Sequence, residues 1–397
     1  MGRDEPVIPR NVEDTPLQRS ATRRCLSKTS VSSPARRLFS RLDKSWILEH
    51  TRKSIISLLF LFRSEAAGHL IPAENKAVSP PGNCFMTHRI YSGLDRLPGG
   101  LASDTVTPGC LVLEGGALRG TYSVGVMDAL MEADVNFECT IGVSAGALNG
   151  ISYVSGQIGR SARSPLRYRH DPRYFGLGAF MRNRTPFGFD FMFGELSRTL
   201  DPLDMKRFFR PERRFVAVAT NCFTGKPEYF EKGRCPDIML ATRASSTMPY
   251  ISQMVRMNGT PYLDGGCSCK IPFRWALDNG FQAIVIVKTN PDDYRRDPAA
   301  GRTLARLFYG SKWQALSDAL ARSNADYNEL CDEIETLRQN DRVFVISPSR
   351  SMHIARMEKD LEKLGEWYWL GYHDTQRLMP DLKAYLDRKK DTEHSMQ

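Results

Sequence analysis

The chain has 397 residues, of which 41% are hydrophobic and 25% charged, and this composition excludes a wholly disordered protein. The formal net charge is +10, but residues 1–105 hold 16 basic and 10 acidic residues and so account for +6 of it. Residues 106–397 carry only the remaining +4. Nucleic-acid binding would rest on the overall charge alone, so no nucleic-acid partner is expected.

The sequence divides into three parts. Residues 1–105 form a basic, Ser/Arg-rich extension without helical or strand periodicity, and we expect it to be disordered. Three interpretations are open for this extension. It is a basic tail that contacts anionic surfaces or acts as a targeting peptide, it is a solvated linker, or it precedes the true translation start at Met86. Residues 106–295 read as an α/β domain, and residues 296–397 as a mostly helical C-terminal region.

Neither a membrane span nor a cofactor is indicated. The longest apolar run, residues 55–62, is interrupted by Ser57 and is far shorter than the roughly 20 residues that a spanning helix needs. The nine cysteines are odd in number and scattered, and no Cys-x-x-Cys pair occurs. We therefore expect reduced thiols, a cytoplasmic location with or without peripheral membrane contact, and no metal or other cofactor. The oligomeric state is left open.

Strands and helices alternate after Cys110, which predicts a mainly parallel sheet covered by helices on both faces. A hairpin about Asn258-Gly259 follows in the same domain. The expected strands are 110–114, 137–143, 215–219 and 283–288; the expected helices are 119–133, 145–155 and 236–245; the hairpin joins 254–257 to 261–263.

The C-terminal region is predicted to be helical over residues 303–339 and to contain one strand at 343–347. A last helical stretch runs from 354 to about 387. Gly371 and Pro380 predict breaks in that stretch.

A donor-rich turn is the first chemical signal. Gly115-Gly116-Ala117-Leu118-Arg119-Gly120 lies between a strand and a helix, where successive N–H groups and a helix N-terminus favour a bound anion. That anion is a phosphate or the oxyanion of an acyl-transfer intermediate. A tight turn without such a role is the alternative.

A nucleophile elbow follows one unit later. Gly142-Val143-Ser144-Ala145-Gly146 matches Gly-x-Ser-x-Gly, with a strand before the serine and a helix after it. Such a serine needs a base, yet none of the seven histidines lies in a glycine-rich turn. Asp264-Gly265-Gly266, after a hairpin strand, is the other candidate base, and an ordinary Asp-Gly turn is its alternative.

These three motifs in this order resemble the patatin-like phospholipase family, which uses a Ser–Asp dyad. Ala244-Ser-Ser-Thr-Met-Pro249 and Asn221-Cys-Phe-Thr-Gly225 also resemble segments of that family. The resemblance implies a three-layer α/β fold, a mostly helical C-terminal extension, Ser144 as nucleophile and Asp264 as proton acceptor. It also implies an oxyanion hole within residues 115–120 and motif glycines at 142, 146, 265 and 266.

The family usually has glycine where Ala117 stands, so we expect a turn that is compatible with an L-residue. The function implied is hydrolysis of fatty-acyl esters through an acyl-enzyme, with a lipid substrate at a membrane surface. The alternatives are a Ser–His–Asp esterase or thioesterase that uses His353 or His373, and a catalytically idle membrane-binding protein. The aromatic segment 180–193 is either a lid that meets lipid or a cap over the core.

Overall fold

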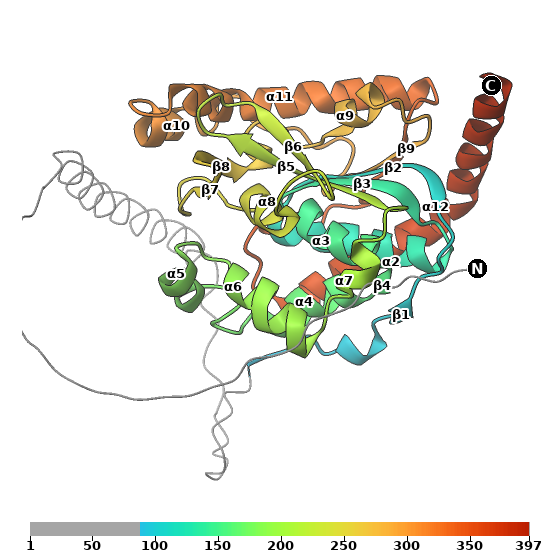
Figure 1. Cartoon of the computed structure of the whole chain (residues 1–397), viewed down its shortest axis with the longest axis horizontal. Coiled ribbons are helices and arrows are strands. Elements are labelled where there is room, and N and C mark those ends of the chain that lie inside the picture. Colours follow the sequence, from blue (N-terminus) through green and yellow to red (C-terminus); the bar gives the residue numbers. More distant parts are fainter. Residues whose placement is uncertain (1–87, 397) are drawn as a thin grey trace, which may run out of the picture. The chain divides into compact units, whose positions relative to one another are not determined.

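The computed structural model describes residues 88–396 (Figure 1). The predicted extension therefore lies largely outside the described residues, as does Met86. In chain order the elements are η1 (Leu94–Arg96), β1 (Gly100–Leu101), β2 (Thr107–Leu113), η2 (Ala117–Gly120), α2 (Thr121–Glu132), β3 (Phe137–Val143), α3 (Ala145–Val154), β4 (Gln157–Ile158), α4 (Arg160–Tyr168), α5 (Leu177–Asn183), α6 (Phe189–Phe191), the π-helix η3 (Met192–Leu200), α7 (Met205–Phe208), β5 (Arg214–Asn221), β6 (Pro227–Glu231), α8 (Ile238–Ser245), β7 (Val255–Met257), β8 (Thr260–Asp264), η4 (Gly265–Cys267), α9 (Phe273–Asp278), β9 (Ile284–Val287), α10 (Arg302–Tyr309), α11 (Gln314–Gln339), β10 (Phe344–Ile346) and α12 (Leu361–Met396).

An eight-stranded sheet organises these elements in the order β10-β9-β2-β3-β5-β8-β7, with β6 also paired to β5. The strands from β10 to β5 are parallel, and β6, β7 and β8 pair antiparallel. The expected mainly parallel sheet is confirmed, and its C-terminal region adds β10 at one edge.

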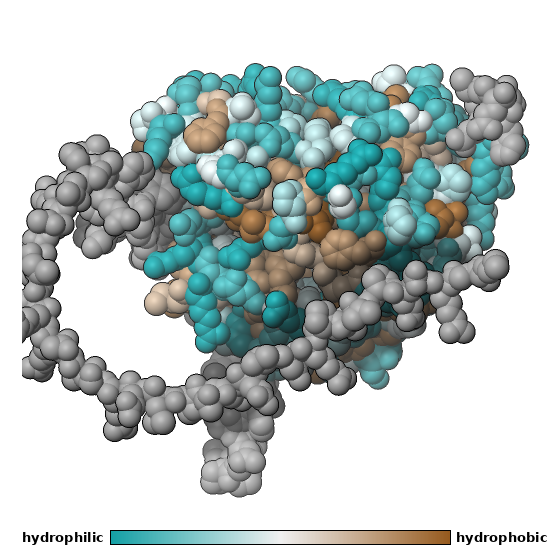
Figure 2. Space-filling model, viewed as in Figure 1, coloured by the Kyte–Doolittle hydropathy of each residue, from teal (hydrophilic) through white to brown (hydrophobic). Residues whose placement is uncertain are grey.

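Helices cover both faces of the sheet, which makes three layers (Figure 1). Alternate side chains of β2 point to opposite faces: Cys110 and Val112 pack with α9 and α11, whereas Leu111 and Leu113 pack with α2 and α12. The outer α10–α11 layer is mostly hydrophilic on the face shown in Figure 2, and hydrophobic residues gather across the middle of that face. No helix within residues 88–396 combines the length and apolar character needed to cross a bilayer.

Strand β5 brings two distant segments together. Val216 and Val218 pair with β3 on one edge and with β6 on the other. The next residue, Ala219, pairs with β6 and with Asp264 of β8. Because β6 occupies one edge throughout, β3 and β8 share the opposite edge and approach each other end to end. Ser144, directly after β3, therefore faces the end of β8.

The last helix is continuous, so the expected breaks at Gly371 and Pro380 are wrong. α12 crosses α2 so closely that a Cβ on Gly371 would lie 2.1 Å from the Tyr122 carbonyl oxygen, and one on Gly125 would lie 2.0 Å from that of Tyr368. Gly371 and Gly125 let the two backbones approach, and the packing of α12 on α2 outweighs the tendency of glycine to interrupt a helix.

Two other boundaries differ from expectation. The stretch 303–339 is divided, because α10 ends at Tyr309 and Trp313 turns into the core before α11 begins. Residues 88–105 pack on the body: Tyr91 is buried, and its N–H donates to the Leu166 carbonyl. The described end of the predicted extension is thus part of the folded unit.

Candidate active site

Ser144 occupies a strained turn between β3 and α3. Its backbone angles are φ 55° and ψ −121°, in the region that L-residues rarely adopt. The flanking glycines are required by contact: a Cβ on Gly142 would lie 2.5 Å from the Gly146 carbonyl carbon, and one on Gly146 2.6 Å from the Leu113 carbonyl oxygen. The predicted elbow is therefore present, with its serine 8% exposed.

The Asp264 carboxylate accepts a hydrogen bond from the Ser144 hydroxyl. The Ser144 Oγ donates to Asp264 Oδ2 over 2.6 Å, and the Gly266 N–H donates to Oδ1 over 2.8 Å. The Thr220 hydroxyl donates to the Asp264 carbonyl oxygen at 2.8 Å. A Cβ on Gly265 would lie 2.2 Å from the Val218 carbonyl oxygen, so glycine is needed there too. Both carboxylate oxygens are thus fixed, one of them on the serine.

The pKa of Asp264 is raised from its ordinary value because the carboxyl group is buried. The hydrogen bonds from Ser144 and Gly266 act in the opposite direction, as do the charges of Arg356 and Lys270. A carboxylate that is desolvated yet still accepts the serine hydroxyl is suited to take up a proton.

The glycine-rich turn leaves two of its amides available. Three other N–H groups donate within the protein: Gly115 to the Lys270 carbonyl, Leu118 to that of Arg356, and Arg119 to that of Gly116. Gly120 lies within η2 and directly before α2. Among the residues of 88–396, the N–H groups of Gly116 and Ala117 have no acceptor. Of the six residues 115–120 in which an oxyanion hole was predicted, Gly116 and Ala117 are therefore the two whose N–H groups are free to donate, and α3 begins nearby at Ala145.

Ala117 departs from the expectation of a turn that suits an L-residue. Its φ is 49°, in the left-handed region, which costs alanine about 1–2 kcal/mol relative to its ordinary conformations. Glu114 stabilises the turn from below: it is fully buried and accepts the Thr289 N–H at 2.6 Å. Arg119 donates to the Asn290 side chain at 3.1 Å.

Residues 245–247, at the C-terminal end of α8, form hydrogen bonds to Ser144 and Asp264, a role that the sequence did not predict. Ser245 Oγ accepts the Ser144 N–H at 2.9 Å, and the Ser246 hydroxyl donates to the Ser144 carbonyl oxygen at 3.0 Å. The Thr247 carbonyl accepts the Asp264 N–H at 2.8 Å. The small-residue stretch 244–249 was visible in the sequence, but its contacts depend on the fold.

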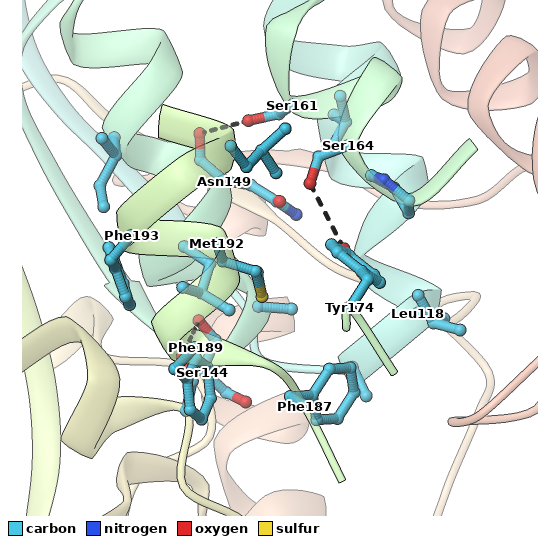
Figure 3. Close-up of a pocket in the computed structure, with 18 of the residues that line it drawn as sticks. Leu118, Ser144, Asn149, Ser161, Ser164, Tyr174, Phe187, Phe189, Met192 and Phe193 are labelled. Carbon is cyan, nitrogen blue, oxygen red and sulfur yellow. Dashed lines mark hydrogen bonds between the residues drawn. The ribbon is translucent and has the colours of Figure 1, made fainter. Parts of the chain in front are cut away.

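An apolar cavity opens on one side of Ser144 (Figure 3). In that view Ser144 lies near the ring of Phe189, and Ser161 and Ser164 lie at the far end. Its lining is largely aliphatic and aromatic: Leu118, Val124, Leu148, Ile151, Phe187, Phe189, Met192, Phe193 and Leu196. Such a lining suits a hydrocarbon chain.

The aromatic segment 180–193 lines this cavity. It was expected to be either a lid that meets lipid or a cap over the core, and its position shares features of both. Phe187 and Phe189 are at most 9% exposed and belong to one cluster with Phe191 and Tyr174. An ion pair from Arg243 to Asp190 fixes the segment, and one from Arg173 to Glu195 fixes the residues directly after it. The rings are buried, as a core cap requires, but they also form one wall beside Ser144.

A second, cationic cavity opens on the other side of Ser144. It shares Ser144, Ala117 and Met248 with the first and is lined by Gly116 and Asp264. Four basic side chains also line it: Arg119, Lys270, Arg296 and Arg356. Ser144 thus lies where an apolar and a cationic space meet.

Among the side chains of residues 88–391, no histidine lines either cavity. His353 and His373 are exposed, and His373 bonds to Gln376 and stacks on Trp369. The geometry gives no support to a serine–histidine arrangement at these two positions. Over residues 88–396 there is also no group of three or more His, Cys, Asp and Glu side chains placed to hold a metal ion.

Comparison with known proteins is consistent with this site. The family model for patatin-like phospholipases matches residues 111–277, which include both Ser144 and Asp264. A domain of unknown function, DUF6363, matches residues 314–387. YjjU of Escherichia coli (strain K12), described as an uncharacterized protein, is 30% identical over 268 residues, 66% of this chain and 74% of that protein.

More distant similarities are weaker. Lysophospholipase nte1 of Aspergillus terreus (strain NIH 2624 / FGSC A1156) is 29% identical over 166 residues, 39% of this chain but only 10% of that protein. The crystal structure of VipD from Legionella pneumophila is 14% identical, covers 76% of this chain and 72% of that one, and has a TM-score of 0.40. Human GIVD cytosolic phospholipase A2, in complex with methyl γ-linolenyl fluorophosphonate, is 10% identical, covers 72% and 59%, and has a TM-score of 0.37.

The family assignment rests on the family model and on the bacterial relative, of which this chain covers nearly three quarters. Together with the elbow and the aspartate that faces it, they identify the chain as a member of the patatin-like phospholipase family.

Proposed function

We propose that the protein is a serine lipid acyl hydrolase in which Ser144 is the nucleophile and Asp264 the proton acceptor. The observation that carries this proposal is the 2.6 Å contact between the two side chains at the junction of an apolar and a cationic cavity. The family model and the lysophospholipase relative support a lipid ester as substrate.

The chemistry follows from the contacts. Asp264 takes the hydroxyl proton as Ser144 Oγ attacks the ester carbonyl carbon, and the free N–H groups of Gly116 and Ala117 stabilise the oxyanion. When the C–O bond breaks, the proton passes from Asp264 to the leaving alcohol and the acyl group stays on Ser144. Water then attacks the acyl-enzyme, and Asp264 again takes the proton. As the bond from the acyl group to Ser144 Oγ breaks, the proton passes from Asp264 to Ser144 Oγ and the fatty acid leaves.

The two cavities divide the substrate. The acyl chain lies in the apolar cavity lined by Leu148 and Phe189, because only there does it contact aliphatic and aromatic side chains. The alcohol side of the ester lies towards the cationic cavity. This arrangement supports a phospholipase A or lysophospholipase type of reaction, the cleavage of one fatty-acyl ester bond.

We further propose that the lipid is met at a membrane surface, as a peripheral contact of a cytoplasmic protein. Leu177 and Met181 on α5 are 65% and 71% exposed, next to the aromatic segment. Large exposed apolar side chains beside the basic Arg182 and Arg184 suit contact with an anionic interface.

A lipid panel tests the proposal. Wild type is expected to release fatty acid from phospholipid or lysophospholipid micelles, and Ser144→Ala to release none above background. Ser155→Ala, at the other end of α3 and outside both cavities, is the matched control and keeps the wild-type rate. Equal rates in Ser144→Ala and wild type would exclude the proposed nucleophile.

A further inference from the structure

Four basic side chains meet in the cationic cavity from four separate parts of the chain. Arg119 comes from the turn before α2, Lys270 follows η4, and Arg296 and Arg356 come from the loops before α10 and α12. Burial, together with the charges of Arg296 and Arg356, lowers the pKa of Lys270 to about 7. The cations are therefore close enough to repel one another.

No carboxylate within residues 88–396 forms an ion pair with any of the four. Of the acidic side chains that the structure describes, Asp264 alone lines the cavity, and it is hydrogen-bonded to Ser144 and Gly266. Arg296 is only 8% exposed, and its guanidinium makes no hydrogen bond to the described residues. Arg119 and Lys270 are half-buried, and Arg356 is exposed. A buried arginine beside three further cations without an ion-pair partner is costly, so a ligand that supplies the counter-charge would stabilise this cluster.

The C-terminal region forms one wall of this cavity. Arg356, Ser323 and Asn324 line it, and all three lie in the part that matches the domain of unknown function. This wall is hydrogen-bonded to the glycine-rich turn at residues 115–120. The Leu118 N–H donates to the Arg356 carbonyl at 3.1 Å, and Trp367 Nε1 donates to the Arg119 carbonyl at 2.8 Å.

We propose that the C-terminal region completes a head-group site, in which Arg119, Lys270, Arg296 and Arg356 bind the phosphate of a lipid whose head group is net negative. The inference rests on the proposed function and adds the substrate class. Guanidinium groups pair with phosphate through charge-assisted hydrogen bonds. A choline or ethanolamine head group would bring a cation into the cluster, where none of the described carboxylates is free to pair with it. Selection for anionic over zwitterionic phospholipid follows.

The test compares phosphatidate with phosphatidylcholine of the same acyl chains, diluted in neutral detergent micelles so that the surface charge stays low. Wild type is expected to give a kcat/KM at least about tenfold higher for phosphatidate. Arg356→Gln and Arg296→Gln each lower this ratio about tenfold, the typical loss of one charge-assisted hydrogen bond. Arg322→Gln, an exposed residue next to Ser323 on α11, removes the same charge and leaves the ratio unchanged.

Equal kcat/KM for the two lipids in wild type would overturn the inference, and so would an unchanged ratio in Arg356→Gln. Arg296 lies 4.3 Å over the Tyr327 ring, so if its variant does not fold, Arg356→Gln carries the test. Inorganic phosphate added to both assays distinguishes a site for a lipid head group from a site for free phosphate. Competition with phosphatidate supports a head-group site, whereas binding of phosphate without any lipid preference would show a site for the free ion and refute the proposal.

Failure of the proposed function is recognised separately. If wild type hydrolyses no ester, calorimetry with Ser144→Ala and dioctanoyl lipids still measures head-group binding. About tenfold tighter binding of the phosphatidate than of the phosphatidylcholine supports the site, and equal binding refutes it.

Discussion

Replacing Asp264 by asparagine separates the role of its charge from that of its shape. The Gly266 N–H, 2.8 Å from Oδ1, will select the amide oxygen of the new side chain. The amide NH2 then faces Ser144 Oγ at the place where Oδ2 now accepts its proton over 2.6 Å. A donor replaces an acceptor, so the serine has no base. General-base catalysis typically contributes about 10²–10⁴-fold, and kcat should fall by that factor.

The same change should make the fold more stable at neutral pH. Burial raises the pKa of Asp264, so the folded state favours its protonated form. For a group of this sign, the stabilising contribution is complete below the unfolded pKa of about 3.9 and is lost as the pH rises through the folded pKa. Asparagine has no such loss. The Tm of Asp264→Asn should therefore exceed that of wild type at pH 8 by more than at pH 5.

Asp128→Asn is the matched control. Asp128 is also a buried carboxylate whose pKa is raised, to about 7, by burial, and it accepts the Gly159 N–H and the Tyr368 hydroxyl, each at 2.9 Å. It lies on α2 outside both cavities. We expect it to share the gain in Tm but to keep wild-type kcat on a chromogenic ester. If Asp264→Asn retains kcat within tenfold, the assignment of the base is wrong.

Three further outcomes are expected. Ser245→Ala leaves the buried amide of the nucleophile without its acceptor, at a cost of about 1–3 kcal/mol, and should lower kcat about tenfold or more in steady-state assays. Gly125→Ala forces apart α2 and α12 and should lower the free energy of unfolding in urea by about 1–3 kcal/mol. Gly99→Ala, with nothing within 4 Å of its new Cβ, should change it by less than about 0.5 kcal/mol. As the pH rises past about 7, Lys270 loses its proton, so kcat/KM for an anionic lipid should fall, and Lys270→Gln should abolish this fall.

Local signals explain why the elbow could be predicted. β3 was expected over residues 137–143 and is found there, because a short apolar run that ends in glycine-flanked serine specifies strand, turn and helix through neighbouring residues. The α/β fold class followed from the same alternation and is confirmed. The aspartate was distinguishable from an ordinary turn only through the family resemblance.

Long-range contacts explain what was missed. Nothing in the sequence around Arg296 or Arg356 indicates that they converge on one cavity, because both lie in irregular loops without a motif, Arg296 directly after Arg295. The continuity of α12 was hidden for a similar reason: Gly371 reads as a break until the backbone of α2 is known to lie against it. Such residues are placed by packing rather than by local pattern.

The shared edge of β5 has a consequence for how this protein tolerates changes in length. Ser144 and Asp264 are 120 positions apart in sequence, yet both are located by counting residues along one strand. The connections between β3 and β8 can therefore gain or lose residues while the side chains of Ser144 and Asp264 keep their spacing. β8 itself cannot, since a slip of one residue along β5 would turn the Asp264 carboxylate to the opposite face of the sheet. Insertions should be accepted at the surface loops, and a single deletion between Thr260 and Asp264 should inactivate a protein that is otherwise folded.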